Sequence, residues 1–394
     1  MRVLFASRNY FPAGAVGGAQ TSIKFLAQSF IAQGHEAAVL NLDDHRHFGL
    51  HAATGVPEYR LKLRNLYTDG QRGPLPKALW HGIDRFGSLM DKSYAQVIEA
   101  HRPDVVFTHV LAGLGTGIWR AARRSGVPVV HMVHDYYLLC IKSGMRAGEG
   151  NCARPCRLCM TVAAQPDVRH TRDVNAVIYV SDHVQKQHEA AELFANARAH
   201  IIHGSYEPAQ GVPPRTGRVD EAVLTLGYFG RIAPDKGVTQ MIDALRGLQD
   251  VAWRLRVGGK FAPGYEERVR EAARGLPVEF LGVQAPFDFY SGVDAVIVPS
   301  LWHDPAPRVV YEAGMHGVVP LVANRGGLPQ LVGYGSRGLV FDIDDGLSLQ
   351  TAIKTLAENR SELERIRKEW VKAAPQFSQG VVTNQVLDVL ASVQ

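Results

Sequence analysis

The 394-residue sequence has no stretch close to the roughly 20 uninterrupted apolar residues that a membrane-spanning helix needs. It also lacks a signal-peptide core, because the apolar run after Met1-Arg2 is too short and instead predicts a first buried strand. Hydrophobic residues make up 46% and charged residues 21% of the chain, which is typical of globular proteins. We therefore expect a globular protein located in the cytoplasm.

Cysteine is scarce, and all four residues fall within one short segment: Cys140, Cys152, Cys156 and Cys159. Thiols this close together in a cytoplasmic chain indicate a metal site more often than a disulfide. The Cys156-x-x-Cys159 spacing suits half of a zinc site, so we predict a structural zinc that shapes a long loop following His134. The irregular spacing on the other side leaves free thiols, a redox pair and an iron–sulfur cluster as alternatives.

A dense block of basic residues is also absent, although positive charge is unevenly distributed. Residues 1–200 contain 23 Lys and Arg against 16 Asp and Glu, a net charge of +7, and residues 201–394 carry −2. Only Arg120, Arg123 and Arg124 cluster, on one face of an expected helix. Such a charge attracts anionic lipid or nucleic acid, and a scattered solvated surface is the plain alternative. We expect peripheral contact with the inner face of an anionic membrane and no nucleic-acid partner.

The order of apolar segments predicts an α/β protein. An apolar run at 2–7, helical spacing over 19–33 and a strand at 36–42 form a β-α-β unit, and this pattern recurs. Glycine and proline interrupt it around 204–222, after which it starts again. We therefore predict two Rossmann-like domains with parallel sheets that face a central cleft, with these bounds: 1–205, 206–375, and a C-terminal helix at 376–394 that packs back on the first domain.

The first candidate site is a glycine loop between the first strand and the first helix, containing Gly14, Gly17 and Gly18. Backbone amides at such a helix start can face an anion or a sugar hydroxyl. The pattern is not Gly-x-Gly-x-x-Gly, and a turn that needs glycine only for its backbone shape is the alternative.

The second candidate is the loop that starts at Gly230, where a predicted strand delivers Arg231 and Lys236 to the start of a helix. Two cations beside free helix amides suit a diphosphate, because charge-assisted hydrogen bonds to phosphate oxygens are strong. A solvated loop that carries these charges by chance is the alternative.

The third candidate follows another strand and contains two acids, Asp304 and Glu312, eight positions apart. Carboxylates accept hydrogen bonds from sugar and ribose hydroxyls, and the helix that begins near Pro307 or Arg308 adds donors. Arg308 and Val309 are predicted to bind the donor as well. Two acids on an ordinary solvated loop and helix would be the simpler interpretation.

Together these motifs resemble glycosyltransferase family 4, retaining enzymes with the GT-B fold, over nearly the whole chain. The resemblance implies that Arg231 and Lys236 hold the donor diphosphate, that Glu312 binds the ribose, and that Asp304 contacts the donor sugar. His134, in Val133-His134-Asp135, looks like the family histidine near the transferred sugar. The sequence departs from the family pattern in two ways: the family usually has Glu where Asp304 stands, and the flanking prolines at 305 and 307 remove amides that could donate to the sugar or phosphate.

The resemblance therefore implies a nucleotide diphosphate-sugar as donor, a saccharide or lipid-linked acceptor, and cell-envelope polysaccharide or glycoconjugate synthesis. No catalytic metal is expected, because Asp342-Ile343-Asp344 lies beyond the donor motif and is interpreted as a surface loop. Arg231 and Lys236 would then supply the positive charge for the leaving group. The competing classes are a nucleotide-sugar epimerase or phosphorylase of the same fold, and a non-catalytic nucleotide-sugar-binding partner protein.

Overall fold

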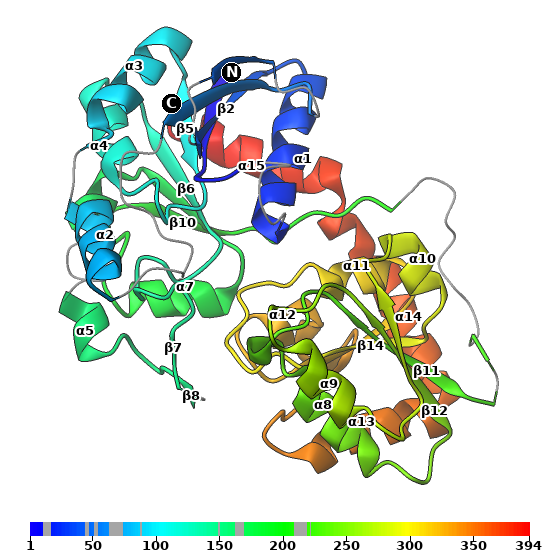
Figure 1. The fold of residues 1–394 in the computed structure, drawn as a ribbon. Coiled ribbons are helices and arrows are strands. Elements are labelled where there is room, and N and C mark those ends of the chain that lie inside the picture. Colours follow the sequence, from blue (N-terminus) through cyan, green and yellow to red (C-terminus); the bar gives the residue numbers. More distant parts are fainter. Residues whose placement is uncertain are drawn as a thin grey trace. The chain divides into compact units, whose positions relative to one another are not determined.

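A computed structural model describes the chain except for residues 11–16, 44–46, 51–53, 63–73, 87–88, 149, 162–168, 209–218 and 221 (Figure 1). The described residues divide into two compact units. Unit 1 comprises Met1–Gly204 together with Gln379–Gln394, and unit 2 comprises Ser205–Ser378. Each unit is built on its own sheet.

Unit 1 contains an eight-stranded sheet in the order β10-β9-β6-β5-β1-β2-β4-β3. Neighbouring strands are parallel except for β3 and β4, which are antiparallel. The strands are β1 (Arg2–Ala6), β2 (Glu36–Asp43), β3 (His47–Leu50), β4 (Pro57–Lys62), β5 (Val105–Thr108), β6 (Val129–Val133), β9 (Ala176–Tyr179) and β10 (Arg198–Ile201). A separate hairpin pairs β7 (Arg146–Ala147) with β8 (Gly150–Asn151).

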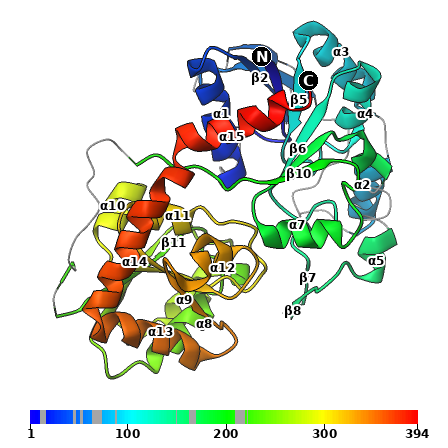
Figure 2. The same cartoon turned by 180° about the vertical axis from the view of Figure 1, so that it is seen from behind.

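Helices cover the central strands of this sheet on both faces, and the buried residues 3–6 of β1 and 105–107 of β5 are apolar. The longer helices are α1 (Gly18–Ala32), α2 (Pro74–Phe86), α3 (Asp91–His101), α4 (Gly117–Arg124), α7 (Asp182–Glu189) and α15 (Gln379–Ala391). In both views α1 and α15 lie on one side of the sheet and α3 and α4 on the other (Figures 1 and 2). A parallel strand that is buried on both faces exposes neither face to solvent, so its expected sequence is an uninterrupted apolar run.

The C-terminal helix α15 belongs to unit 1 although it follows unit 2 in the sequence. It lies alongside α1 in both views (Figures 1 and 2). The Gln379 side-chain amide donates to the Phe25 carbonyl at 3.1 Å, and the Thr383 and Ser29 hydroxyls are 3.0 Å apart. Val382, Val386 and Leu390 are buried, so the contact also has an apolar side.

Unit 2 contains a six-stranded, fully parallel sheet in the order β13-β12-β11-β14-β15-β16. Its strands are β11 (Leu224–Phe229), β12 (Trp253–Gly258), β13 (Val278–Gly282), β14 (Ala295–Val298), β15 (Val319–Ala323) and β16 (Leu339–Phe341). Its helices are α8 (Val238–Arg246), α9 (Glu266–Ala272), α10 (Pro286–Ser291), α11 (Val309–Met315), α12 (Leu328–Leu331), α13 (Gly346–Glu358) and α14 (Arg360–Ala373).

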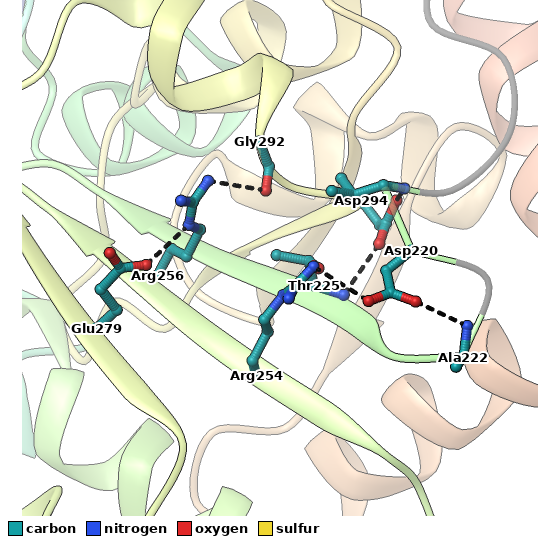
Figure 3. A network of polar contacts seen from close by, with 9 residues as sticks. Asp220, Ala222, Thr225, Arg254, Arg256, Glu279, Gly292 and Asp294 are labelled. Atoms are coloured by element: carbon teal, nitrogen blue, oxygen red, sulfur yellow. Dashed lines mark hydrogen bonds and ion pairs between the residues drawn. The ribbon is translucent and has the colours of Figure 1, made fainter.

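A polar network joins the amino ends of these strands (Figure 3). The fully buried Asp294, directly before β14, accepts hydrogen bonds from the main-chain amides of Val219 and Thr225 at 2.8 and 2.9 Å. The Arg254 guanidinium donates to the Thr225 hydroxyl at 2.9 Å. Arg256 donates to Glu279 at 3.1 Å. The network ties strand starts together, at the edge of the sheet away from the loops that follow β11 and β14.

The fold class predicted from the sequence is confirmed, since both sheets are built from parallel α/β units. The sequence interpretation did not include the antiparallel strand β3 or the helices α2 and α3. Across the part of the chain that the structure describes, no helix is long and apolar enough to cross a membrane.

Candidate functional site

The loop after β11 carries the two predicted diphosphate-binding cations. The Arg231 guanidinium contacts the Asp235 carboxylate four residues later at 2.7 Å, and its side chain is 56% exposed. A short 3₁₀ turn, Pro234–Lys236, leads to Gly237, which has a φ of +69°. A Cβ atom on Gly237 would lie 1.9 Å from the Pro299 carbonyl oxygen, so only glycine lets this loop approach the segment after β14.

Lys236 and Asp304 form an ion pair between these two loops. The Lys236 ammonium lies 2.5 Å from a carboxylate oxygen of Asp304, and the two side chains are 22% and 7% exposed. The same oxygen accepts a hydrogen bond from the Ser300 hydroxyl at 3.2 Å. The ammonium also lies 5.1 Å from the centre of the Trp302 ring, within the range of a cation–π contact. The lysine is therefore held by an acid and a ring while part of it remains accessible.

The segment around Asp304 is fixed by main-chain contacts to the loop after β15. The Gly327 amide donates to the Asp304 carbonyl at 2.9 Å. Gly326 has a φ of +55°, and a Cβ atom there would lie 2.3 Å from the same carbonyl oxygen. A larger residue at Gly326 would push the Asp304 loop away, so the acid's position depends on this glycine.

Glu312 lies in the first turn of α11 and is held by two side chains. The Arg308 guanidinium donates to one carboxylate oxygen at 2.9 Å, and the Tyr290 hydroxyl donates to the other at 3.2 Å. Burial, and then the charge and hydrogen bond of Glu312, raise the pKa of Tyr290 well above its ordinary value. The tyrosine therefore stays protonated and donates. Val309, also predicted at the donor site, is the first residue of α11.

Sequence reasoning did not single out several side chains of this region. Tyr290 comes from α10, and the Tyr206 hydroxyl pairs with the His316 ring nitrogen at 2.8 Å next to it. The His316 and Tyr290 rings stack with their centres 5.2 Å apart. No sequence signal marks these aromatic residues, because the contacts join elements far apart in the chain.

The remaining predicted site residues lie in unit 1. Gly17 is the residue before α1 and Gly18 its first residue, while Gly14 lies outside the described residues. His134 directly follows β6, and its ring nitrogen Nε2 lies 3.1 Å from Nδ1 of His109. Burial lowers the pKa of His134 to about 4, so the ring is neutral at physiological pH.

The four cysteines are free thiols on and around the β7–β8 hairpin. Cys140 and Cys159 are buried and Cys156 is exposed. Among the described residues, no group of three or more His, Cys, Asp or Glu side chains is arranged to hold a metal ion. The structural zinc at Cys140, Cys152, Cys156 and Cys159 therefore gains no support from the structure and stays a prediction. One zinc per chain in the purified protein would support it, and zinc-free protein would remove it.

The arginine cluster of α4 is paired with acids. Arg120 and Arg124 contact Asp91 at 3.2 and 3.8 Å, and Arg123 contacts Asp173. These pairs neutralise part of the charge that the sequence assigned to this helix face.

Two family profiles cover most of the chain. Residues 216–376 match the profile described as Glycosyl transferases group 1, and residues 16–210 match Glycosyltransferase Family 4. The two matches correspond closely to units 2 and 1.

Individual relatives agree with these two profile matches. The chain is 26% identical to an uncharacterized 42.6 kDa protein in the cps region of Klebsiella pneumoniae, over 84% of this chain and 87% of the relative. It is 27% identical to the lipopolysaccharide 1,2-N-acetylglucosaminetransferase of Salmonella typhimurium, over 41% of this chain and 49% of that enzyme. Anabaena HepE, solved in complex with UDP, has the same fold, with a TM-score of 0.74, 19% identity and complete coverage of both chains.

Proposed function

We propose, on the premise that the chain belongs to glycosyltransferase family 4 and has the GT-B fold, that it moves a sugar from a nucleotide diphosphate-sugar to a saccharide or lipid-linked acceptor. The anomeric configuration is retained, and no catalytic metal takes part. The relative from the Klebsiella cps region favours a place in cell-envelope polysaccharide synthesis.

The observation that carries this proposal is the arrangement of charges at the carboxyl end of the sheet in unit 2. Two acids with little exposure, Asp304 and Glu312, each hold a cation, and Arg231 remains largely exposed. Ligands of open α/β sheets bind outside the carboxyl ends of the strands. A diphosphate can take the contacts of Arg231 and Lys236, while the spare lone pairs of Glu312 accept hydrogen bonds from ribose hydroxyls.

The proposed chemistry follows from these charges. Negative charge grows on the departing diphosphate as the bond between the anomeric carbon and the phosphate oxygen breaks. The Arg231 guanidinium and the Lys236 ammonium stabilise that charge. The acceptor hydroxyl attacks from the face that the phosphate leaves, and the leaving phosphate oxygen takes its proton, so that configuration is retained. No carboxylate is assigned as a nucleophile.

Donor binding and turnover test the proposal, with EDTA present. UDP-, GDP- and ADP-sugars are screened against wild type and Glu312→Ala, starting with UDP-glucose. Glu362→Ala is the matched control, since Glu362 pairs with Arg365 at 2.7 Å on the surface of the same unit. One donor should bind wild type and the control, and Glu312→Ala should weaken that binding at least ~10-fold, because hydrogen bonds to a charged group contribute about 1.5–3 kcal/mol. Absence of binding to every donor would refute the transferase assignment.

The Lys236–Asp304 ion pair also favours a second candidate, a protein that binds nucleotide-sugar without transferring it. An Asp side chain that is already held by a lysine and a serine has fewer lone pairs to offer a sugar hydroxyl. Tight donor binding without hydrolysis or transfer, across a panel of saccharide acceptors, would support this candidate over the enzyme.

We further propose that the acceptor binds unit 1, near Gly17, residues 43–76 and the cysteine segment, and that the protein contacts anionic membranes. Residues 44–46, 51–53 and 63–73 of that range lie outside the described residues. The motivation is the net charge of +7 over residues 1–200. Vesicles that contain anionic lipid should sediment the protein at low salt and release it at high salt, because surface charges are screened. Failure to bind at low salt would remove the membrane proposal without affecting donor binding.

A further inference from the structure

Two histidines lie side by side at the carboxyl ends of neighbouring strands in unit 1. His109 directly follows β5 and His134 directly follows β6, and these strands pair in parallel. Nδ1 of His109 and Nε2 of His134 are 3.1 Å apart, within hydrogen-bonding distance. The ring centres are 5.4 Å apart with an angle of 27° between the planes.

His109 is held firmly in the core. It is 2% exposed, and its ring stacks on Phe5 with an angle of 8° and lies 4.3 Å from the Phe107 ring centre. Its main-chain amide donates to the Ala6 carbonyl at 2.9 Å. The second ring nitrogen, Nε2, is buried and has no hydrogen-bond partner among the described residues. Within the described part of the chain, His134 is therefore the one hydrogen-bonding contact of the His109 side chain.

Both rings are neutral at physiological pH. Burial lowers the pKa of His134 to about 4. Burial, followed by the charges of His134 and His131, lowers the pKa of His109 well below its ordinary value. A neutral imidazole has one N–H and one acceptor nitrogen, so one histidine of the pair donates and the other accepts.

The unpartnered Nε2 of His109 decides between the two arrangements. If His134 donated, His109 would carry its proton on Nε2, where a buried N–H would have no acceptor. If His109 donates from Nδ1, its Nε2 carries no hydrogen, and the proton of His134 is on Nδ1. The second arrangement leaves a bare ring nitrogen in the core in place of an N–H, and orphaned buried N–H groups are rarer in folded proteins than buried acceptors without a partner.

We propose that His109 is a positioning residue that donates to His134 and fixes it as the Nδ1–H tautomer, so that His134 offers a neutral N–H donor to a sugar oxygen of substrate. The role of His134 toward substrate rests on the proposed function, whereas the tautomer does not.

Nitrogen-15 NMR of labelled histidine side chains tests the tautomer directly. In wild type, Nδ1 of His134 should be protonated and Nε2 should show the shift of an accepting nitrogen, with His134→Gln used to assign the signals. A wild-type His134 protonated at Nε2 would overturn the proposal, whatever the activity of the protein.

Substitutions at His109 then separate positioning from packing. In His109→Asn the side-chain amide can donate from near the Nδ1 position, whereas His109→Leu fills space without a donor. We expect His109→Leu to lose the fixed tautomer and to lower kcat for donor turnover about 10-fold with little change in KM, a drop equivalent to ~1.4 kcal/mol. His109→Asn should retain both the Nδ1–H tautomer of His134 and the wild-type kcat.

Equal loss in both variants would show that His109 acts only through packing and would contradict the proposal. If wild type turns over no donor at all, the proposed function fails, while the NMR result still decides the tautomer.

Discussion

The two ends of the parallel sheet in unit 2 hold their buried carboxylates in different ways. At the amino end, Asp294 accepts hydrogen bonds from main-chain amides (Figure 3). At the carboxyl end, Asp304 and Glu312 are paired with the side chains of Lys236 and Arg308. A main-chain amide cannot leave its acceptor without disturbing the sheet, whereas a side-chain cation can exchange one anion for another. We infer that the amino end stabilises the fold and that the carboxyl end binds ligand.

The largest effect is expected at Lys236. Lys236→Ala should lower donor turnover about 10²–10³-fold, the usual consequence of removing one group that stabilises developing negative charge. Turnover per folded molecule, with the folded fraction measured by circular dichroism, checks this. Lys354→Ala is the matched control, because Lys354 pairs with Asp250 at 2.8 Å on the surface of the same unit. A similar loss of donor turnover in Lys236→Ala and Lys354→Ala would contradict a special role for the carboxyl end of the sheet.

At the amino end, Asp294→Ala should reduce stability rather than activity. The substitution leaves two main-chain amides without their acceptor, and the expected cost is about 2–3 kcal/mol in the free energy of unfolding. Urea denaturation followed by circular dichroism measures the shift in midpoint. Donor affinity of the remaining folded protein should be unchanged, and weaker binding would show that the amino end is not purely structural.

A smaller effect is expected at Asp304, whose role differs from that of Lys236. Asp304→Asn removes the ion pair but keeps a polar side chain of the same length. Turnover of the sugar donor should fall about 10-fold, equivalent to ~1.4 kcal/mol, while the affinity for the free nucleoside diphosphate stays within about threefold. Titration calorimetry with the sugar donor and with the free nucleoside diphosphate, beside the turnover assay, separates an effect on the sugar from an effect on the diphosphate. Equal losses would indicate that Asp304 acts only by holding Lys236.

The smallest expected effect is on the pH dependence of stability, and it concerns His188, a buried histidine of unit 1 that is held by the main chain. His188 donates from Nδ1 to the Val184 carbonyl at 2.8 Å, and burial lowers its pKa to about 4. Because the unfolded pKa is about 6.5, the unfolded state binds more protons between these values, and stability falls as the pH drops through this window. At pH 5.5 the loss is about 1 kcal/mol.

The measurement is urea denaturation of wild type and His188→Gln at pH 7.5 and pH 5.5. The variant should lose less stability on acidification than wild type. Identical losses would show that His188 does not carry this pH dependence.

Much of the fold could be predicted from the sequence because its signals are local. The buried parallel strands appear as short apolar runs, and proline and glycine mark the break between the two halves of the sequence. The motif loops after β11 and β14 were found for the same reason, since cations, acids and glycines lie within a few residues of each other. Their functional roles remain proposals.

The missed features depend on contacts between distant segments. Tyr290 donates to Glu312 from another helix, 22 residues away in the sequence. His109 and His134 follow two different strands and are 25 residues apart. Neither residue type stands out in a chain with 13 tyrosines and 16 histidines. The partners of Arg120 and Arg123 were missed similarly, because a charge cluster in sequence does not reveal which acids the fold brings beside it.

Hydrogen–deuterium exchange with and without a nucleotide-sugar donor tests the difference between the two ends most directly. We expect new protection in peptides that cover 230–237 and 301–312, with no change in peptides that cover 222–226 and 292–296. Protection at the amino end, or none at the carboxyl end under conditions where calorimetry shows the donor bound, would contradict it.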